Sequence, residues 1–448
     1  MPLKNWTQDF SCRKHFKSLY RMNISNKKIF PKQAISACFL SFLWLCFCCY
    51  HANSNVLTST DRANRTTTHQ YDDRDCQSSV KDVLDKVTAF SYDDDGRLLK
   101  TTYDDGTSTS SVYDELGRVI QQTDQKGRVK KFTFDELGRL VDVTQVMDAS
   151  DSSQDLVTAY AYDEVGNKIL QTDAKGNRTS FAYDNMGRLI GRKLPGEQVE
   201  TMAYNSVGQL MAKTDFAGHT THYAYDQRGR LIQKTPDASL GEATVSFSYP
   251  NELTKISTRG SIQNIYKYDA ARGWLNSVQT ANGTINYSYD AAGNRTKVRI
   301  TGKDGGNRET DYAYDELNRV STVSRTGMGT LANYSYDAVG NVSQITRANG
   351  VISTFGYDDL HRLTSIQHKQ GTTVLSQFQY ALSADGRRNT LQEYLKYPTG
   401  QPVASVNRTV FYGYDNAGRL NAEQRQSTST LTAGRNRRKH RTDCVDIR

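Results

Sequence analysis

The chain has 448 residues, of which 37% are hydrophobic and 23% charged, and its net charge is +9. This length suits two or three ordinary domains unless the chain is a repeat array. With 7 prolines and 27 tyrosines, the composition argues against disorder and collagen and favours many β-strands. So polar a chain is also no polytopic membrane protein.

The positive charge lies at the two ends of the chain. Residues 1–33 carry eight Lys or Arg against one acid, and residues 434–448 carry six against two, so the rest of the chain sums to −2. Non-specific binding of DNA or RNA needs a basic surface that neutralises phosphates. The body of the chain lacks that excess, and we therefore expect no nucleic-acid partner.

The N-terminal part has the order of an export signal. A basic flank, residues 1–33, precedes a hydrophobic segment, residues 34–52, and Met22 is an alternative start that gives the flank an ordinary length. The segment predicts either a cleaved signal or a retained membrane anchor. We expect an exported protein, extracellular or in the cell envelope, with a polar linker over residues 53–89.

The cysteines do not form a disulfide framework. Four of the seven lie inside the hydrophobic segment, and Cys76 and Cys444 flank a body that contains none. This spacing excludes a zinc site in the body. It leaves open a single long bridge between Cys76 and Cys444, or two free thiols.

A short phrase of the form Y-D-x-x-G-R-L, such as YDNMGRL, recurs from Tyr92 to Tyr414, most often at a step of 21 residues. Such a period decides the architecture before any local motif does. Tyr249, in a longer gap, belongs to a decayed copy. We assign structural roles in the clearest copies to these residues: Tyr92, Asp93, Gly96, Tyr113, Asp114, Gly117, Phe134, Asp135, Gly138, Tyr183, Asp184, Gly187, Tyr289, Asp290, Gly293, Tyr336, Asp337, Gly340, Tyr414, Asp415 and Gly418.

Each copy predicts one β-hairpin. An aromatic residue usually stands two positions before the tyrosine, with a small residue between them, as in Phe90-Ser91-Tyr92; this is the period of a strand. Asp opens a turn and Gly supplies the positive φ that closes it, while Asn318 replaces Gly in one copy. A second turn follows about ten residues later, as at residues 123–127. The fold class is therefore all-β: a repeat array of hairpins of about 21 residues forming a coiled antiparallel sheet or partial hollow shell.

The phrase and its spacing resemble the YD repeats of the bacterial Rhs family, whose animal relatives are the teneurins. The resemblance covers residues 90–420 and implies a β-strand spiral that forms a hollow shell, in many members around a C-terminal toxin. Carbohydrate binding at cell surfaces is an older interpretation of the same repeat. The chain departs from the family after Leu420, where residues 421–448 form a polar, basic tail that we expect to be disordered. It therefore resembles a short or truncated member without the family's protease residues or a recognisable toxin domain.

These observations predict a non-enzymatic, exported structural protein, the shell or scaffold portion of an Rhs-type polymorphic toxin or of a cell-surface protein. No sequence constellation indicates catalytic, cofactor-binding or metal-binding residues. The expected partners are an enclosed or neighbouring toxin and its immunity protein. The alternative is a cell-surface adhesin that binds carbohydrate through the aromatic rows of the repeats.

Overall fold

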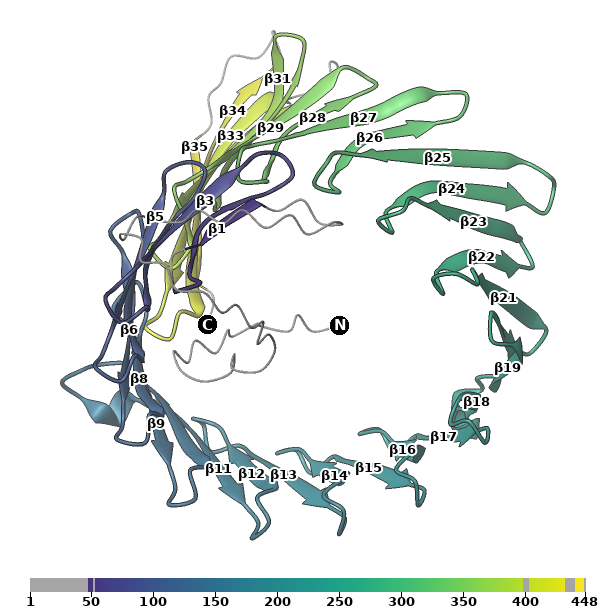
Figure 1. Ribbon diagram of the computed structural model, residues 1–448, viewed down its shortest axis with the longest axis horizontal. Helices are drawn as coiled ribbons and strands as arrows, with labels where there is room; N and C mark the ends of the chain where they lie inside the picture. The colour runs from purple at the N-terminus through teal and green to yellow at the C-terminus, as the bar shows by residue number, and fades with distance from the viewer. Residues whose placement is uncertain (1–46, 51–52, 398–402, 432–439, 447–448) are drawn as a thin grey trace, which may run out of the picture. The chain divides into compact units, whose positions relative to one another are not determined.

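The computed structural model describes residues 47–50, 53–397, 403–431 and 440–446. Two compact units are distinguished: unit 1 comprises residues 1–131 and 334–448, and unit 2 comprises residues 132–333. Within the described residues the chain forms 35 strands and two short 3₁₀ helices. The predicted all-β class is therefore confirmed, and successive strands pair as antiparallel hairpins (Figure 1).

The strands of unit 1 come from both ends of its sequence. They are β1 (Phe47–Tyr50), β2 (Val56–Thr60), β3 (Thr66–Tyr71), β4 (Gln77–Lys81), β5 (Val87–Tyr92), β6 (Leu98–Thr102), β7 (Ser108–Tyr113), β8 (Val119–Thr123), β28 (Val342–Arg347), β29 (Val351–Tyr357), β30 (Leu363–Gln370), β31 (Thr373–Leu382), β32 (Arg388–Lys396), β33 (Val403–Tyr414), β34 (Leu420–Leu431) and β35 (His440–Asp446). Two strands extend across the unit boundaries: β9 (Val129–Phe134) and β27 (Gly329–Tyr336).

Unit 2 is one uninterrupted series of hairpins. Its strands are β10 (Leu140–Gln145), β11 (Leu156–Tyr162), β12 (Lys168–Thr172), β13 (Arg178–Tyr183), β14 (Leu189–Lys193), β15 (Val199–Tyr204), β16 (Leu210–Thr214), β17 (Thr220–Tyr225), β18 (Leu231–Thr235), β19 (Val245–Asn251), β20 (Thr254–Arg259), β21 (Ile262–Tyr268), β22 (Leu275–Thr280), β23 (Gly283–Tyr289), β24 (Arg295–Gly302), β25 (Asn307–Tyr314) and β26 (Val320–Arg325). The 3₁₀ helices η1 (Ser152–Gln154) and η2 (Ala238–Leu240) lie in two of its loops.

The two faces of the sheet differ because side chains alternate along each strand. In β15, Glu200 is buried, Met202 and Tyr204 are partly buried, and the residues between them are exposed. We call the tyrosine-bearing side the aromatic face. Buried hydrophobic side chains are rare: within the described part of the chain they are Cys76 and Val410. The hairpins are thus held by contacts between neighbouring repeats more than by a central core.

A β-bulge recurs where each strand reaches its YD tyrosine. In the pair β13–β14 the register shifts between Ala182 and Tyr183, and the pairs β15–β16 and β17–β18 shift at the equivalent tyrosines. A bulge bends the strand and increases its twist. Because the bulge recurs, the strands of successive repeats bend at equivalent positions.

The hairpins begin earlier than the sequence predicts. Residues 53–89 were expected to be a linker, but β2, β3 and β4 fall within them. Their turns have Asn64, Asp75 and Asp85 at positive φ where other copies have Gly. Asn and Asp tolerate this conformation better than other non-glycine residues. A search for glycine therefore misses these turns.

The expectation of a disordered tail over residues 421–448 also differs from the structure. Strand β34 continues to Leu431, and β35 pairs with it from His440 to Asp446. The segment is polar, yet a sheet that does not require an apolar core accepts polar strands. Residues 432–439 lie outside the described residues.

The predicted signal or anchor, residues 34–52, lies outside the described residues except for β1. Within the described part of the chain, no helix is long and apolar enough to cross a membrane. Cys76 is buried and is not part of a disulfide, so the structure does not contain the bridge to Cys444.

Candidate functional site

The YD turn, which contains the aspartate and glycine of the phrase, recurs along the chain. Both carboxylate oxygens of its aspartate accept hydrogen bonds. In the copy at residues 184–188, Asp184 Oδ1 accepts hydrogen bonds from the backbone N–H groups of Met186 at 2.9 Å and Arg188 at 3.0 Å. Its Oδ2 accepts one from Arg188 Nε at 2.7 Å. The backbone N–H of Arg188 and the guanidinium together hold the pKa of Asp184 below its ordinary value.

Glycine closes the turn because the backbone must adopt a positive φ. Gly187 has φ 73° and donates its N–H to the Asp184 carbonyl at 2.9 Å. A side chain at this position is strained in most residue types. The predicted glycines all have positive φ: Gly96, Gly117, Gly138, Gly187, Gly293, Gly340 and Gly418. Asn318 also has positive φ, at 61°, as its place in the phrase predicts.

The arginine after the turn reaches into the next repeat. Arg188 Nη1 donates to the carbonyl of Asn205 at 3.0 Å, and its guanidinium lies 5.0 Å from the ring centre of Tyr204. A cation over a tyrosine ring is attracted by the ring's quadrupole. The same stacking on the tyrosine of the following repeat occurs in these pairs: Arg97 with Tyr113, Arg139 with Tyr162, Arg230 with Tyr249 and Arg387 with Tyr414.

The tyrosine hydroxyl reaches back into the preceding repeat. Tyr204 donates to the carbonyl of Leu189 at 3.0 Å, and Tyr113 donates to that of Leu98 at 2.8 Å. Burial raises the pKa of Tyr113, so its hydroxyl remains a protonated donor. The same hydrogen bond is made by Tyr71, Tyr92, Tyr162, Tyr225, Tyr249, Tyr289, Tyr314, Tyr357 and Tyr414. Together with the arginine contacts, it forms what we call the repeat lock.

One natural variation shows what the turn requires. In the copy at residues 205–209, Asn205 takes the place of Asp and accepts from the backbone N–H groups of Val207 at 3.1 Å and Gln209 at 2.8 Å. Its amide donates to Gln209 Oε1 at 2.7 Å, where copies such as Asp184 with Arg188 have an ion pair. A neutral amide pair thus reproduces the geometry. The turn needs hydrogen-bond acceptors at this position and does not need an acid.

The predicted positions occupy equivalent places in successive hairpins. The aspartates that accept the turn's backbone N–H groups include Asp93, Asp114, Asp135, Asp184, Asp290, Asp337 and Asp415. Phe134 lacks a hydroxyl, and Tyr183 donates no hydrogen bond within the described residues. Tyr249 makes the hydrogen bond of the lock at 3.0 Å, which agrees with its interpretation as a decayed copy.

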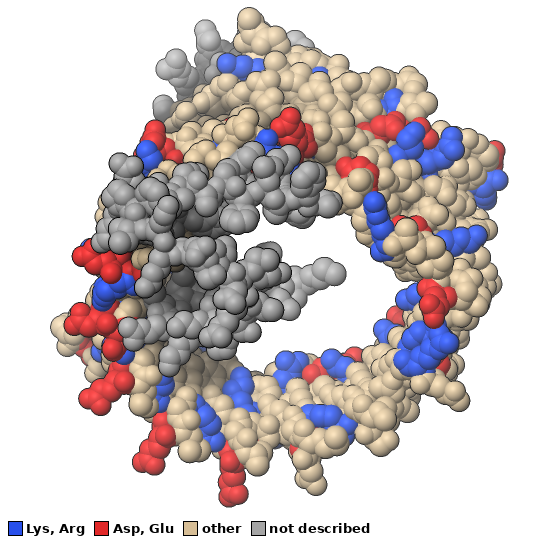
Figure 2. Space-filling view, viewed as in Figure 1, with Lys and Arg blue, Asp and Glu red and all other residues tan. Residues whose placement is uncertain are grey.

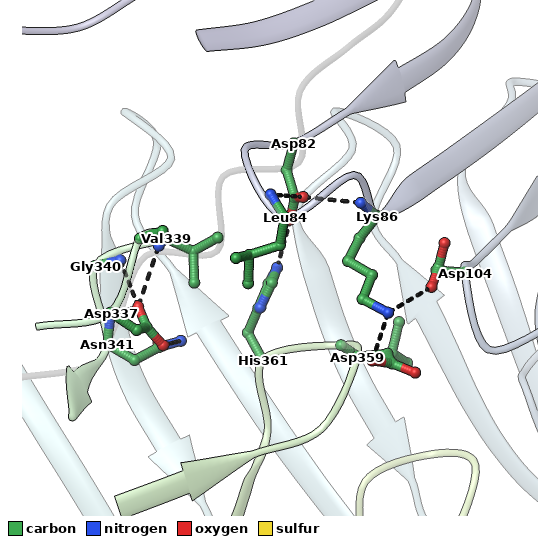
Figure 3. A network of polar contacts seen from close by, with 12 residues as sticks. Asp82, Leu84, Lys86, Asp104, Asp337, Val339, Gly340, Asn341, Asp359 and His361 are labelled. Carbon is green, nitrogen blue, oxygen red and sulfur yellow. Dashed lines mark hydrogen bonds and ion pairs between the residues drawn. The ribbon is translucent and has the colours of Figure 1, made fainter. Parts of the chain in front are cut away.

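In unit 1, turns that are far apart in the sequence also contact one another, and the recurrent phrase does not predict these contacts. The return turns, which join one YD hairpin to the next, lie against YD turns about 270 residues further along the chain. Lys86 Nζ lies 2.6 Å from Asp359 Oδ1 and 3.2 Å from Asp104 Oδ2, and His361 Nε2 lies 2.8 Å from Asp82 Oδ2 (Figure 3). Hydrogen bonding to Asp359 raises the pKa of Lys86, which therefore stays charged.

This turn contact continues along the same edges. Arg65 Nη1 donates to the carbonyl of Ala338 at 2.9 Å, and Arg128 pairs with Asp385, which is 10% exposed. Burial alone would raise the pKa of Asp385, but its hydrogen bond to Ser383 and the charge of Arg128 hold it below the ordinary value. The signal that could have revealed His361 is its place in the glycine slot of YDDLHRL, where its φ is 60°.

Two further carboxylates, Glu393 and Glu200, form ion pairs with bases of neighbouring strands. An open depression of about 560 Å³ over β31–β34 includes Glu393 and Arg408 in its lining, and these two form an ion pair. Glu200, 7% exposed, lies 2.7 Å from Lys213 Nζ and 3.2 Å from Arg192 Nη2. Among the residues that the structure describes, no three His, Cys, Asp or Glu side chains gather as a metal site.

Hairpins of one type joined by repeat locks define a YD-repeat sheet. The family model described as Teneurin YD-shell matches residues 48–193 and 123–274, which together exceed half of the chain, and the RHS Repeat model matches residues 336–373. The chain therefore belongs to the Rhs/YD-repeat family, as the phrase in its sequence predicts. A search of curated proteins finds no match.

Solved structures share the fold at low sequence identity. The crystal structure of TcdB2-TccC3 is 15% identical with a TM-score of 0.56, over 87% of this chain and 24% of that one. The crystal structure of TcdB2-TccC3-Cdc42 is 17% identical with a TM-score of 0.57, over 89% of this chain and 24% of that one. This chain spans about a quarter of the length of these structures. Its fold is the YD-repeat sheet of the Rhs family.

Proposed function

We propose that this chain is the non-enzymatic shell portion of an exported Rhs-type system and that it encloses or shields a toxin polypeptide. The observation that carries the proposal is the repeat lock. The recurring positions of each phrase are engaged in contacts that build the sheet. The aspartate binds within its own turn, and the arginine and tyrosine bind the adjoining repeats. Few of these groups are left for acid-base chemistry, and the Asn205 copy needs no acid at all.

The family resemblance supports the choice of partner. Shells of this family enclose a C-terminal toxin in many members, and such a toxin is accompanied by an immunity protein that protects the producing cell. An exported location suits this role, and the basic and hydrophobic N-terminal segments support it. The structural positions from Tyr92 to Gly418 then serve to hold the wall together.

A protease-protection assay tests the proposal. The full chain is produced with an unfolded, protease-sensitive polypeptide fused after Arg448, and cleavage of the fused segment is compared with cleavage of the same polypeptide alone. Shielding predicts slower cleavage in the fusion, lost when Tyr204 and Tyr225 are both changed to Ala. Equal cleavage rates for the fused and the free polypeptide, with the wild-type sheet intact by circular dichroism, would contradict the proposal.

The alternative of carbohydrate binding through the aromatic rows has less support. Cations already lie over several of the rings: Lys168 over Tyr160 and Phe181, and Arg295 over Tyr287 and Tyr312. Sugar stacking requires an uncovered ring face. A glycan array distinguishes the two functions, because specific binding that is lost when Tyr287 and Tyr289 are substituted with the fold intact would favour the adhesin.

A further inference from the structure

A buried serine hydroxyl in unit 1 lies between two basic side chains. Ser353 of β29 is fully buried, and its Oγ lies 2.6 Å from Arg347 Nη1 and 2.6 Å from His368 Nδ1. Arg347 ends β28, and His368 lies opposite Ser353 on β30. Because the two nitrogens share one oxygen, they are at most about 5 Å apart. We call these three residues the His368 cluster.

The hydrogen bonds of the His368 cluster run in one direction. A guanidinium can only donate, so Ser353 Oγ accepts from Arg347. The single proton of the hydroxyl then goes to His368 Nδ1, which accepts a hydrogen bond only while it carries no proton. No further partner of this hydroxyl lies among the described residues. The arrangement therefore suits a neutral histidine with its proton on Nε2.

The strands and return turns around the His368 cluster contain no acid. β29 and β31, which pair with β30 on its two sides, have no Asp, Glu, Lys or Arg, and neither do the turns 348–350 and 371–372. Arg347 makes no ion pair in the described part of the chain, and Lys369 follows His368 on β30. Elsewhere on the visible face, many Lys and Arg lie beside Asp or Glu (Figure 2). A second positive charge beside Arg347 would have no such neighbour.

The other titratable side chains on the same face have partners of their own. Burial raises the pKa of Tyr357 in β29, which therefore stays neutral. Tyr380 of β31 has its ring centre 4.4 Å from the guanidinium of Arg388. Glu393 of β32 forms an ion pair with Arg408. No hydrogen bond or ion pair joins any of these groups to His368.

The surroundings of His368 favour its neutral form. Burial, to which the ring of Phe378 contributes at 6.4 Å between ring centres, and the charge of Arg347 lower the pKa of His368. The unfolded chain then binds the proton more tightly than the folded chain does. The resulting stability is present above the ordinary pKa of 6.5 and is lost as the pH falls below it.

A second histidine of unit 1 provides a contrast. Burial also lowers the pKa of His69 in β3. Its Nδ1, however, lies 2.9 Å from Nε2 of the neutral amide of Gln77. Protonation of His69 therefore brings no like charges together, and the amide can turn to present its oxygen.

We propose that His368 is a pH-sensitive switch of unit 1: in mild acid its imidazolium is repelled by Arg347, the His368 cluster separates, and β28, β29 and β30 loosen, while unit 2 stays intact. The carboxylates of the YD turns remain ionised in this range because their pKa values lie below the ordinary value. This inference goes beyond the proposed shell function and does not depend on a toxin partner.

Hydrogen exchange of the full chain at pH about 7.5 and about 5.5, corrected for the intrinsic rate at each pH, tests the proposal. Protection of β28–β30 should fall at least about threefold at the lower pH, and that of β13 and β14 in unit 2 should not change. The variant His368→Gln, which keeps an acceptor for the Ser353 hydroxyl, should lose this pH dependence. The matched control His69→Gln should retain it.

NMR of the histidine-labelled chain follows the imidazole itself. The His368 signal, identified by its absence from His368→Gln or from His368→Asn should the first variant fail to fold, should titrate below the ordinary histidine value. Arg347→Gln removes the charge but keeps a donor for Ser353, and it should move this titration upward. Three results overturn the proposal: equal protection of β28–β30 at both pH values, a pH-dependent loss that persists in His368→Gln, or a titration that Arg347→Gln leaves unchanged.

Discussion

The two units use the same hairpin but differ in what their turns contact. In unit 2, the described contacts of a repeat are mainly with the repeats before and after it, as in a quasi-one-dimensional array. In unit 1, return turns near the start of the chain also bind YD turns near its end, through pairs such as Lys86 with Asp359 and Arg128 with Asp385. A repeat sheet thus gains long-range contacts when one stretch of hairpins lies against another. The predictions below test this distinction.

The largest effect should come from acid, which acts on both units alike. Hydrogen bonds from backbone N–H groups lower the pKa of Asp184 and Asp226 in unit 2 and of Asp104 in unit 1. Folded pKa values below the unfolded value of about 3.9 stabilise the fold above that pH, and this contribution is lost as pH falls through the folded pKa. Thermal melts followed by circular dichroism should show a falling midpoint below pH about 4. A midpoint that is flat or rising there would contradict this.

The next largest effect, loss of an ion pair, should differ between the two units. Arg128→Ala removes the closest long-range partner of the largely buried Asp385, which keeps Arg387 at 3.1 Å and Lys126 at 4.0 Å. We expect a loss of about 2 kcal/mol in the free energy of unfolding. The comparison substitution Arg259→Ala in unit 2 removes an exposed pair with Glu242 and should have little effect. Hydrogen exchange should increase at residues 383–387 in the first variant. Exchange confined to residues 124–128 would show that the two turns are not coupled.

Removal of the tyrosine hydroxyl of the repeat lock should lower the free energy of unfolding by less than Arg128→Ala does. The decrease should be the same in both units. Tyr204→Phe in unit 2 and Tyr357→Phe in unit 1 each leave a backbone carbonyl without its donor, and we expect about 1 kcal/mol of destabilisation for each. Tyr183→Phe is the control, because this hydroxyl makes no hydrogen bond within the described residues. Denaturant unfolding measures all three, and a loss for Tyr183→Phe equal to the others would remove the role assigned to the hydroxyl.

The smallest effect should be a gain in stability in unit 2 that is absent in unit 1. Glu197 has φ 69° and His361 has φ 60°, so glycine relieves backbone strain at both positions. Glu197→Gly gives up only an exposed pair with Lys193 and should gain about 0.5 kcal/mol. His361→Gly also loses the 2.8 Å contact with Asp82 and should gain nothing. Equal gains in thermal unfolding would mean that the turn contact contributes no stability.

Much of the hairpin could be predicted from the sequence because its determinants are local. The alternation in Phe90-Ser91-Tyr92 predicts a strand, and Asp93 with Gly96 predicts the turn, since each acts within five residues of chain. The early hairpins were missed because Asn64, Asp75 and Asp85 replace the expected glycine. A rule that accepts any residue tolerant of positive φ would have found them.

The contacts between distant turns could not be predicted in the same way. Lys86 and Asp359 are separated by 273 positions; Lys86 lies in a return turn, and Asp359 occupies a variable position of the recurrent phrase. Their pairing depends on the bend added at each bulge and on the number of repeats between them. Small differences per repeat accumulate over this distance, so local patterns do not determine which turns meet.

By itself, the sequence determined that this protein is a series of YD hairpins, because turn chemistry and side-chain alternation act over a few residues. It also limited the search for acid-base chemistry, since each aspartate stands where a turn requires an acceptor. Only the tertiary structure decided where the tyrosines and arginines of one repeat bind the next. It likewise decided that, at the turn position two residues after the Asp or Asn, Val339 and Leu360 are partly buried, whereas Leu116, Leu137, Val165, Met186 and Val207 are exposed to solvent. The reason is physical: these contacts depend on the accumulated twist and bend of many strands, which no short segment contains.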